Sequence, residues 1–143
     1  MQGMNRHDAK AAKVQEEPDC ELDGWAHEVV GSALEVHRAL GPGFLESVYE
    51  QALCVELSAR SVSFRRQVPI AVRYKGQVVG QGELDLLIHD RLVVELETVE
   101  AFAPIHVAQL LSYLKATGLR LGLLINFNVP LLQQGIRRII STP

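Results

Sequence analysis

The chain has 143 residues, with 14 lysines and arginines against 17 aspartates and glutamates, so its formal charge is -3. It is 48% hydrophobic and 22% charged, a composition typical of one globular domain. A chain of about 150 residues buries roughly two thirds of its unfolded surface, which is enough for a single core. The acidic balance excludes a broadly basic protein that coats nucleic acid, but a local basic groove is compatible with it.

No apolar run approaches the roughly 20 residues that cross a bilayer, and the start of the chain has no apolar segment typical of a signal peptide. We therefore expect a cytoplasmic protein with no membrane partner. Residues 1–18 are polar and almost without large apolar side chains, so we expect a flexible N-terminal tail. Residues 19–143 are predicted to form a single domain.

Helical periodicity predicts two helices at the start of this domain. Apolar residues recur at helical spacing over residues 22–37, and Gly41-Pro42-Gly43 ends that helix. A second helix is predicted over residues 45–60. Glu46 lies in its first turn, where the helix dipole favours a carboxylate.

Beyond residue 61 the apolar pattern changes from helical to alternating, which predicts three or four antiparallel strands. A further helix is predicted over residues 104–117, and a nearly continuous apolar run after it predicts a buried strand. The predicted order is α-α-β-β-β-β-α-β-β, an α/β fold in which one mixed sheet of about 4–5 strands is flanked by helices. The segments expected as strands are residues 62–64, 68–74, 78–79, 83–88, 92–97, 119–127 and 135–140.

The apolar pattern of residues 83–97 predicts the register of a hairpin with its loop at residues 89–91. In this register Asp85 faces Glu95, and Glu83 faces Glu97. The apolar residues expected to share the opposite, buried face are Leu84, Leu86, Ile88, Leu92, Val94 and Leu96.

Facing carboxylates on adjacent strands repel one another, so this arrangement needs an explanation. One is a solvated sheet face, where water and salt screen the repulsion. The other is a divalent hard cation, Mg²⁺ or Mn²⁺, bound by the carboxylates. Leu87 and Val93 flank the acids, so a helix is expected to cover this face, which favours the cation.

The helix predicted over residues 104–117 carries a polar stripe made of His106, Gln109 and Tyr113. Taken singly, each is an ordinary boundary or surface residue. Together with the acidic strand pair upstream, they are typical of one edge of a site.

Residues 43–49, Gly-Phe-Leu-Glu-Ser-Val-Tyr, match the pattern Gly-x-x-Glu-x-x-Tyr. Over residues 22–140 the sequence resembles the GxxExxY family, a branch of the PD-(D/E)XK nuclease-like superfamily. Residues 36–43, 108–114 and 122–127 also resemble family segments, in family order. The resemblance implies a restriction-endonuclease-like core and the activity of a metal-dependent hydrolase of nucleic acid.

The resemblance also implies roles for individual residues. Asp85 corresponds to the first metal-binding acid, Glu95 to the acid of (D/E)-x-K, and Glu46 to an acid that adds to the metal shell in several branches. Gln109 and Tyr113 fit a Gln-x-x-x-Tyr helix motif that lines the active site and contacts nucleic acid. The implied cofactor is Mg²⁺ or Mn²⁺.

Glu97 stands where the superfamily pattern has a lysine. An anion there reverses the local field, raises the pKa of the attacking water and repels phosphate. Glu97 would instead bind a second cation, or Lys115 would supply the missing charge from the helix. Two interpretations therefore stay open: a nuclease whose catalytic residues are Asp85, Glu95, Glu97, Gln109 and Tyr113, and a catalytically inactive nuclease-fold interaction or regulatory module.

Contact with DNA or RNA would need arginines and lysines for the backbone phosphates. The basic clusters in the sequence are small, so a solvated face is the alternative for each. A binding module would instead use its apolar surface, for a partner or a homodimer. The candidates for phosphate contact are Arg65, Arg66, Arg73, Lys75, Arg137 and Arg138.

Overall fold

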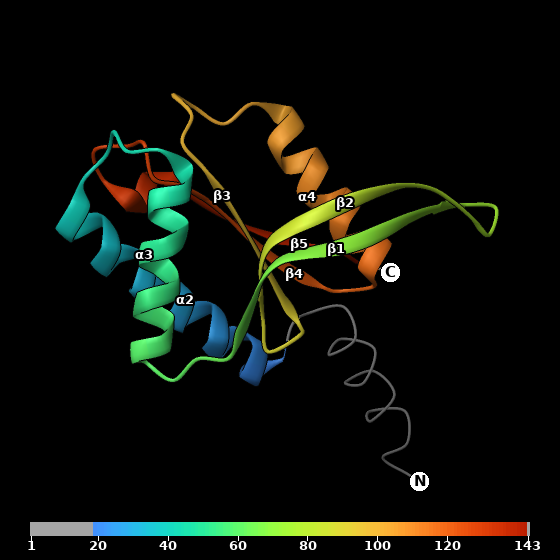
Figure 1. Cartoon of the computed structure of the whole chain (residues 1–143), viewed down its shortest axis with the longest axis horizontal. Coiled ribbons are helices and arrows are strands. Elements are labelled where there is room, and N and C mark those ends of the chain that lie inside the picture. Colours follow the sequence, from blue (N-terminus) through green and yellow to red (C-terminus); the bar gives the residue numbers. More distant parts are fainter. Residues whose placement is uncertain (1–18, 143) are drawn as a thin grey trace, which may run out of the picture.

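The computed structural model describes residues 19–142. Over this range the chain forms a five-stranded mixed sheet with helices on both faces (Figure 1). Helices α2 (Cys20–Leu40) and α3 (Glu46–Ala59) pack on one face, and α4 (Pro104–Thr117) packs on the other. The α/β fold class is confirmed. The tail expected over residues 1–18 lies outside the described residues.

The strands follow one another across the sheet in chain order, β1-β2-β3-β4-β5. All neighbours are antiparallel except β3 and β4, which are parallel because α4 crosses between them. No helix within residues 19–142 has the length and apolar character to cross a bilayer. The strands are β1 (Phe64–Tyr74), β2 (Gln77–Ile88), β3 (Leu92–Glu97), β4 (Leu121–Asn126) and β5 (Ile136–Ile140), with a 3-10 helix η1 (Leu132–Gly135) before β5.

Three strands precede α4 in the structure, within the three or four that the apolar pattern predicts although one fewer than in the predicted order. The segments expected separately at 62–64 and 68–74 merge into β1, and those at 78–79 and 83–88 merge into β2. The polar residues between them stay in the strands because pairing uses backbone groups, as in the Arg66–Leu86 pair.

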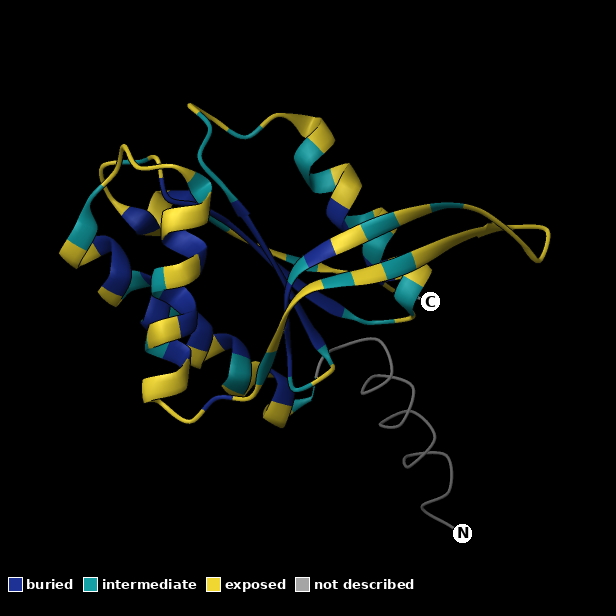
Figure 2. Ribbon diagram, viewed as in Figure 1, coloured by how far each residue is buried: buried dark blue, intermediate teal, exposed yellow. Residues whose placement is uncertain are grey.

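The sheet separates two hydrophobic cores, and its central strands β3 and β4 are buried on both faces (Figure 2). The larger core joins the sheet to α2 and α3, and the smaller joins it to α4. Leu87 and Val93 lie in the smaller core, so the helix cover expected for their face is present.

Strand β2 changes face at Asp85. Five of the six apolar hairpin residues lie in the α2/α3 core as predicted, but Leu84 packs in the α4 core, so the prediction of one shared face is wrong there. The cause is sharp coiling where Gln67 adopts φ 49°, between the Arg66–Leu86 and Val68–Leu84 pairs. Beyond this point β1 and β2 leave the sheet as a two-stranded ribbon (Figure 1).

Candidate active site

Asp85 and Glu95 lie where β2 and β3 separate. The backbone pairing of these strands runs from Ile88–Leu92 to Leu86–Val94 and ends before Asp85. In place of the next backbone pair, the Asp85 N–H donates to Glu95 Oε2 at 2.9 Å, and the Leu96 N–H donates to Asp85 Oδ2 at 2.8 Å. The two carboxylates thus accept the backbone N–H groups of Asp85 and Leu96, which have no carbonyl partner across the two strands. These bonds hold both side chains in place.

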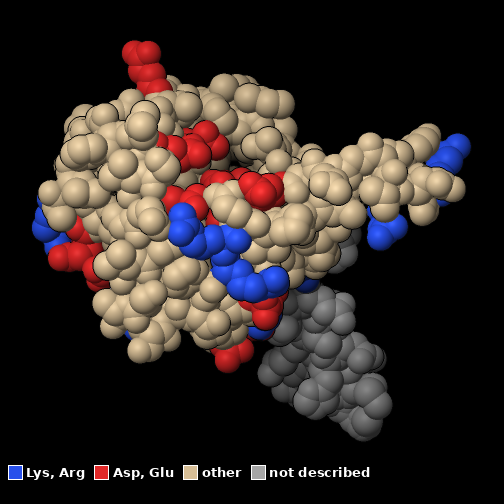
Figure 3. Space-filling view, in the orientation of Figure 1, with Lys and Arg blue, Asp and Glu red and all other residues tan. Residues whose placement is uncertain are grey.

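Glu46, the first residue of α3, is a third carboxyl near Asp85 and Glu95. Burial raises the pKa of Glu46 most, and the charges of Asp85 and Glu97 raise it further, so α3 brings this carboxyl within electrostatic reach of the hairpin. In Figure 3, acidic side chains line a hollow in the middle of the molecular face that is shown. Three elements, α3, β2 and β3, therefore contribute acids to one cluster.

Burial is the main cause of raised pKa values in this cluster. It raises the pKa of Glu95 to about 8, with a further contribution from the charge of Asp85. Burial likewise raises the pKa of Glu46 to about 7 and that of Asp85 to about 6, although the hydrogen bond from Leu96 opposes the shift at Asp85. Within residues 19–142, no lysine or arginine lowers the pKa of these three groups. The cluster therefore concentrates negative charge without a compensating cation.

The carboxylates of Asp85 and Glu95 fit a divalent cation as a pair of ligands. No set of three or more His, Cys, Asp or Glu side chains in the described part of the chain is arranged to hold a metal ion. Mg²⁺, however, is usually bound through one or two carboxylates, with water and substrate phosphates completing its shell. Asp85 and Glu95 each keep one carboxylate oxygen outside the crossed hydrogen bonds, and carboxylate oxygen suits Mg²⁺ and Mn²⁺.

The sequence model of the PD-(D/E)XK nuclease superfamily matches residues 23–139. The chain belongs to this superfamily. It is also similar to the crystal structure of SSO0001, with a TM-score of 0.51 and 18% identity over 68% of the chain. The chain spans 50% of that protein's length, and at this identity the likeness shows the fold alone. No curated protein matches the chain.

Glu97, which the resemblance aligns with the superfamily lysine, lies two residues after Glu95 at the end of β3. Burial raises the pKa of Glu97, and the electrostatic interaction with the His106 side chain opposes this shift. His106 sits in the first turn of α4, where its Nδ1 accepts the Ala103 N–H at 2.8 Å. Glu83 was expected to face Glu97, but it is exposed and lies beyond the end of the β2–β3 pairing, so that facing pair does not form.

Glu50 is a buried acid of the site that sequence analysis missed. It lies one turn after Glu46 on α3 and is 6% exposed. Its Oε2 accepts two bonds from Arg66, at 2.8 and 3.1 Å, and its Oε1 accepts the Gln67 amide at 2.8 Å. Its charge raises the pKa of Asp85. The i, i+4 spacing from Glu46 places both acids on one helix face, and this was the available signal.

Tyr49, the last residue of the Gly-x-x-Glu-x-x-Tyr motif, holds the loop that leads into α3. Its buried hydroxyl donates to the Gly41 carbonyl at 2.5 Å and accepts the Phe44 N–H at 3.2 Å. Its ring stacks on Phe127 at 4.5 Å, and the Phe127 N–H donates to the Glu97 carbonyl at 3.0 Å. The motif thus connects the start of α3 with the end of β3.

The two polar residues expected from α4 have different environments. Gln109 is exposed on the helix. Tyr113 packs in the α4 core against Gly82, where an added Cβ would lie 2.8 Å from the tyrosine ring. Neither side chain hydrogen-bonds to Asp85 or Glu95 within residues 19–142. Tyr113 therefore supports the base of the ribbon.

Three of the six basic residues predicted to contact phosphate are engaged in ion pairs. Arg65 pairs with Asp90 at 2.8 Å, Arg66 with Glu50, and Arg138 with Asp23. The other three form no ion pair within residues 19–142; they are Arg73 and Lys75 on the ribbon and Arg137, which lies over the Phe102 ring.

Proposed function

We propose that this PD-(D/E)XK protein, as a member of the GxxExxY branch, is a divalent-cation-dependent hydrolase of nucleic-acid phosphodiesters centred on Asp85 and Glu95. One observation carries the proposal: crossed hydrogen bonds hold the buried Glu95 carboxylate beside the half-buried Asp85 carboxylate, and no lysine or arginine of residues 19–142 offsets their charge. An uncompensated buried charge of this kind is costly unless it coordinates a metal or takes up a proton.

Asp85 and Glu95 would bind Mg²⁺ or Mn²⁺ directly. Glu46, which residues 19–142 do not place with them as a third ligand, would add to the shell from the first turn of α3 through a water that the cation retains. When bound, the cation would activate a water and neutralise charge that develops on the phosphate. Tyr49 fixes the loop before Glu46, and the crossed hydrogen bonds orient the other two ligands. Gln109, which is exposed on α4, would contact the nucleic acid.

Glu97 supports a second candidate function, a module that keeps the nuclease fold without hydrolysis. A carboxylate at this position repels phosphate, where a lysine would attract it. Lys115, the lysine considered as a replacement, instead lines the space between α4 and the ribbon.

Two measurements separate the functions. Mn²⁺ is expected to raise the midpoint temperature of thermal unfolding by several degrees for the full chain. The midpoint of Asp85→Ala is expected to stay unchanged, because only a chain with both ligands gains the binding energy. Nicking of plasmid DNA with Mg²⁺ or Mn²⁺ is expected for the wild type. Glu97→Lys restores the superfamily cation, and this is expected to accelerate nicking by about 100-fold.

The hydrolase proposal requires cleavage by the wild type that Asp85→Ala abolishes. Cleavage by Glu97→Lys with none by the wild type would establish the module, because fold and ligands would then be intact and only the charge missing. No Mn²⁺ stabilisation and no cleavage by either protein would overturn the hydrolase.

A further inference from the structure

The arginines and lysines of residues 19–142 divide into two groups by their surroundings. Six pair with acids on α2, on α3 or in the β2–β3 loop; these are Arg38, Arg60, Arg65, Arg66, Arg91 and Arg138. The other five form no ion pair within that range and lie on the ribbon, on α4 and beside β4 and β5; these are Arg73, Lys75, Lys115, Arg120 and Arg137. Arg120 is bound to the Ser141 carbonyl and Arg137 lies over the Phe102 ring. Within residues 19–142, the cations left on the ribbon and on α4 are Arg73, Lys75 and Lys115.

The ribbon, which we call the arm, comprises residues 68–84 and projects from the body of the molecule (Figure 1). Residues 66–82 contain no acid, and Figure 3 shows basic but no acidic side chains along the outer part of the arm. Its apolar side chains are unusually exposed: Tyr74 is 64% and Val79 61% accessible. Such a surface fits a ligand that is both anionic and able to cover apolar groups.

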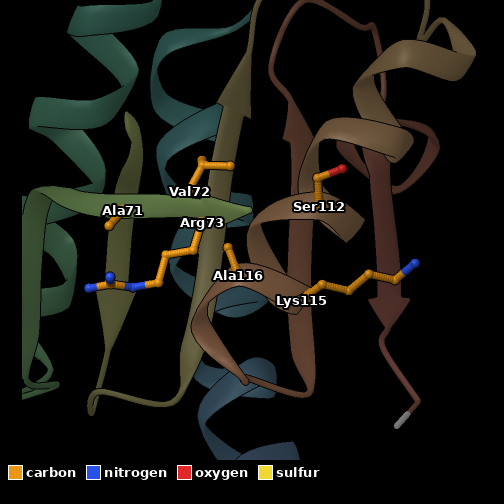
Figure 4. A pocket seen from close by; sticks show the side chains of 6 residues that line it. All are labelled: Ala71, Val72, Arg73, Ser112, Lys115 and Ala116. Atoms are coloured by element: carbon orange, nitrogen blue, oxygen red, sulfur yellow. The ribbon is translucent and has the colours of Figure 1, made fainter. Parts of the chain in front are cut away.

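A cavity of about 450 Å³ separates the arm from the C-terminal half of α4 (Figure 4). Its lining includes Arg73 from β1 and Ser112 and Lys115 from α4. In Figure 4 the Arg73 and Lys115 side chains extend away from each other, on opposite sides of the cavity. Two cations therefore flank a hollow whose other lining residues are uncharged.

The arm also leads directly to the acidic cluster. Asp85 follows the last arm residue on β2, and Gly82 packs on Tyr113 of α4, which fixes the base of the arm. A ligand held along the arm would therefore lie next to the acidic cluster.

We propose that the arm and the adjoining surface of α4 bind duplex DNA, with the arm in the major groove and Arg73, Lys75 and Lys115 on backbone phosphates. This inference rests on the proposed function. The major groove of B-DNA, about 12 Å wide, admits a two-stranded β-ribbon, and its thymine methyl groups accept apolar contacts. The major groove of A-form RNA is too narrow for side chains to enter.

Single-stranded nucleic acid fits the arm less well than a duplex does. Proteins that bind single strands stack successive bases on several aromatic side chains. The arm carries one aromatic residue, Tyr74, and the Lys75 Nζ lies 5.5 Å from its ring centroid. The arm therefore lacks a stacking platform.

The test is fluorescence anisotropy of the full chain in EDTA, with a 5′-labelled DNA duplex of about 20 base pairs as the probe. Arg73→Glu and, separately, Lys115→Glu are compared with Arg38→Glu, which makes the same change in net charge at an exposed arginine paired with Glu35. We expect the two former variants to weaken duplex binding about tenfold and to reduce the salt slope by roughly 0.9 per lost contact, with little effect of Arg38→Glu.

Equal effects of all three variants, or tighter binding of single-stranded DNA or duplex RNA, would overturn the inference. Circular dichroism and the unfolding midpoint of each variant verify that the fold is kept. Duplex binding that depends on Arg73 without any cleavage would overturn the hydrolase and keep the arm. Cleavage of DNA together with duplex binding that Arg73→Glu and Lys115→Glu leave unchanged would overturn the inference about the arm and keep the hydrolase.

Discussion

Asp85 and Glu95 are linked across the end of the β2–β3 pairing: the Asp85 backbone donates to the Glu95 carboxylate at 2.9 Å, and the Asp85 carboxylate accepts the next N–H of β3 at 2.8 Å. Each carboxylate accepts a backbone N–H from the other strand, in the place of a backbone carbonyl of the regular ladder. The position of the acids is therefore a consequence of the strand separation.

Glu95→Gln is expected to stabilise the metal-free protein above about pH 8. Burial raises the pKa of Glu95 to about 8, so at higher pH the wild type carries an uncompensated buried charge that glutamine lacks. Thermal unfolding in EDTA near pH 9 measures the effect, with Glu83→Gln as the exposed control. A lower midpoint for Glu95→Gln would mean that the carboxylate stabilises the fold even without a metal.

The stability of the metal-free protein is expected to fall as pH rises from about 5 to about 8. The pKa values of Asp85, Glu46 and Glu95 are raised to about 6, 7 and 8, so the folded chain holds protons that the unfolded chain has released. This stability is fully present below the ordinary carboxyl values of 3.8 and 4.5 and is lost as pH rises through the raised values. Unfolding midpoints measured across this pH range in EDTA give the dependence of stability on pH. Mn²⁺ favours ionised carboxylates and is expected to make this dependence weaker.

Glu97→Lys is expected to raise the stability of the metal-free protein at pH 8. The charge of Glu97 raises the pKa of Glu46, Asp85 and Glu95, and a lysine at the same position would lower all three. Denaturant unfolding of Glu97→Lys against the exposed control Glu100→Lys isolates the local effect, since both make the same change in net charge. Equal stabilities of the two variants would show that residue 97 does not act on the cluster.

Tyr49→Phe is expected to cost about 1–3 kcal/mol, because the Gly41 carbonyl and the Phe44 N–H lose the hydroxyl that joins them. Urea unfolding measures the loss, and the exposed Tyr74→Phe is the matched control. If the loop positions Glu46, Tyr49→Phe also weakens stabilisation by Mn²⁺, as Glu46→Gln does. An unchanged response to Mn²⁺ would limit Tyr49 to a structural role.

Gly82→Ala is expected to destabilise the protein by about 1–3 kcal/mol, because the new methyl would lie 2.8 Å from the Tyr113 ring and push the arm from α4. Gly80→Ala is the control, since nothing lies within 4 Å of a Cβ at that position. The midpoints of urea unfolding compare the two. Similar midpoints would show that the base of the arm moves freely on α4.

Local signals in the sequence predicted much of the fold. Pro104 and Gly118 mark the two ends of α4 because proline suits a first helical turn and glycine tolerates the left-handed cap, here at φ 74°. The alternation of residues 83–97 correctly predicted the hairpin loop and the three strand pairs that form, because the side-chain period of a strand is two.

Other features depended on contacts between distant segments. Leu84 changes core because β1 coils at Gln67, and no alternation in β2 records the backbone angle of a neighbouring strand. Arg66 was expected on phosphate but pairs with Glu50, since α3 packs across the strand that carries it. Local periodicity carries no information about such partners.

The sequence by itself determined the fold class, the acids of the cluster and the absence of a lysine at residue 97, because these follow from periodicity and from residue identity. Only the tertiary structure decided how the acids meet. The separation of β2 from β3 turns Asp85 and Glu95 into partners for backbone donors, and the packing of α3 brings Glu46 to them. The physical reason is that burial and charge repulsion act through distances in space, which a linear pattern does not contain.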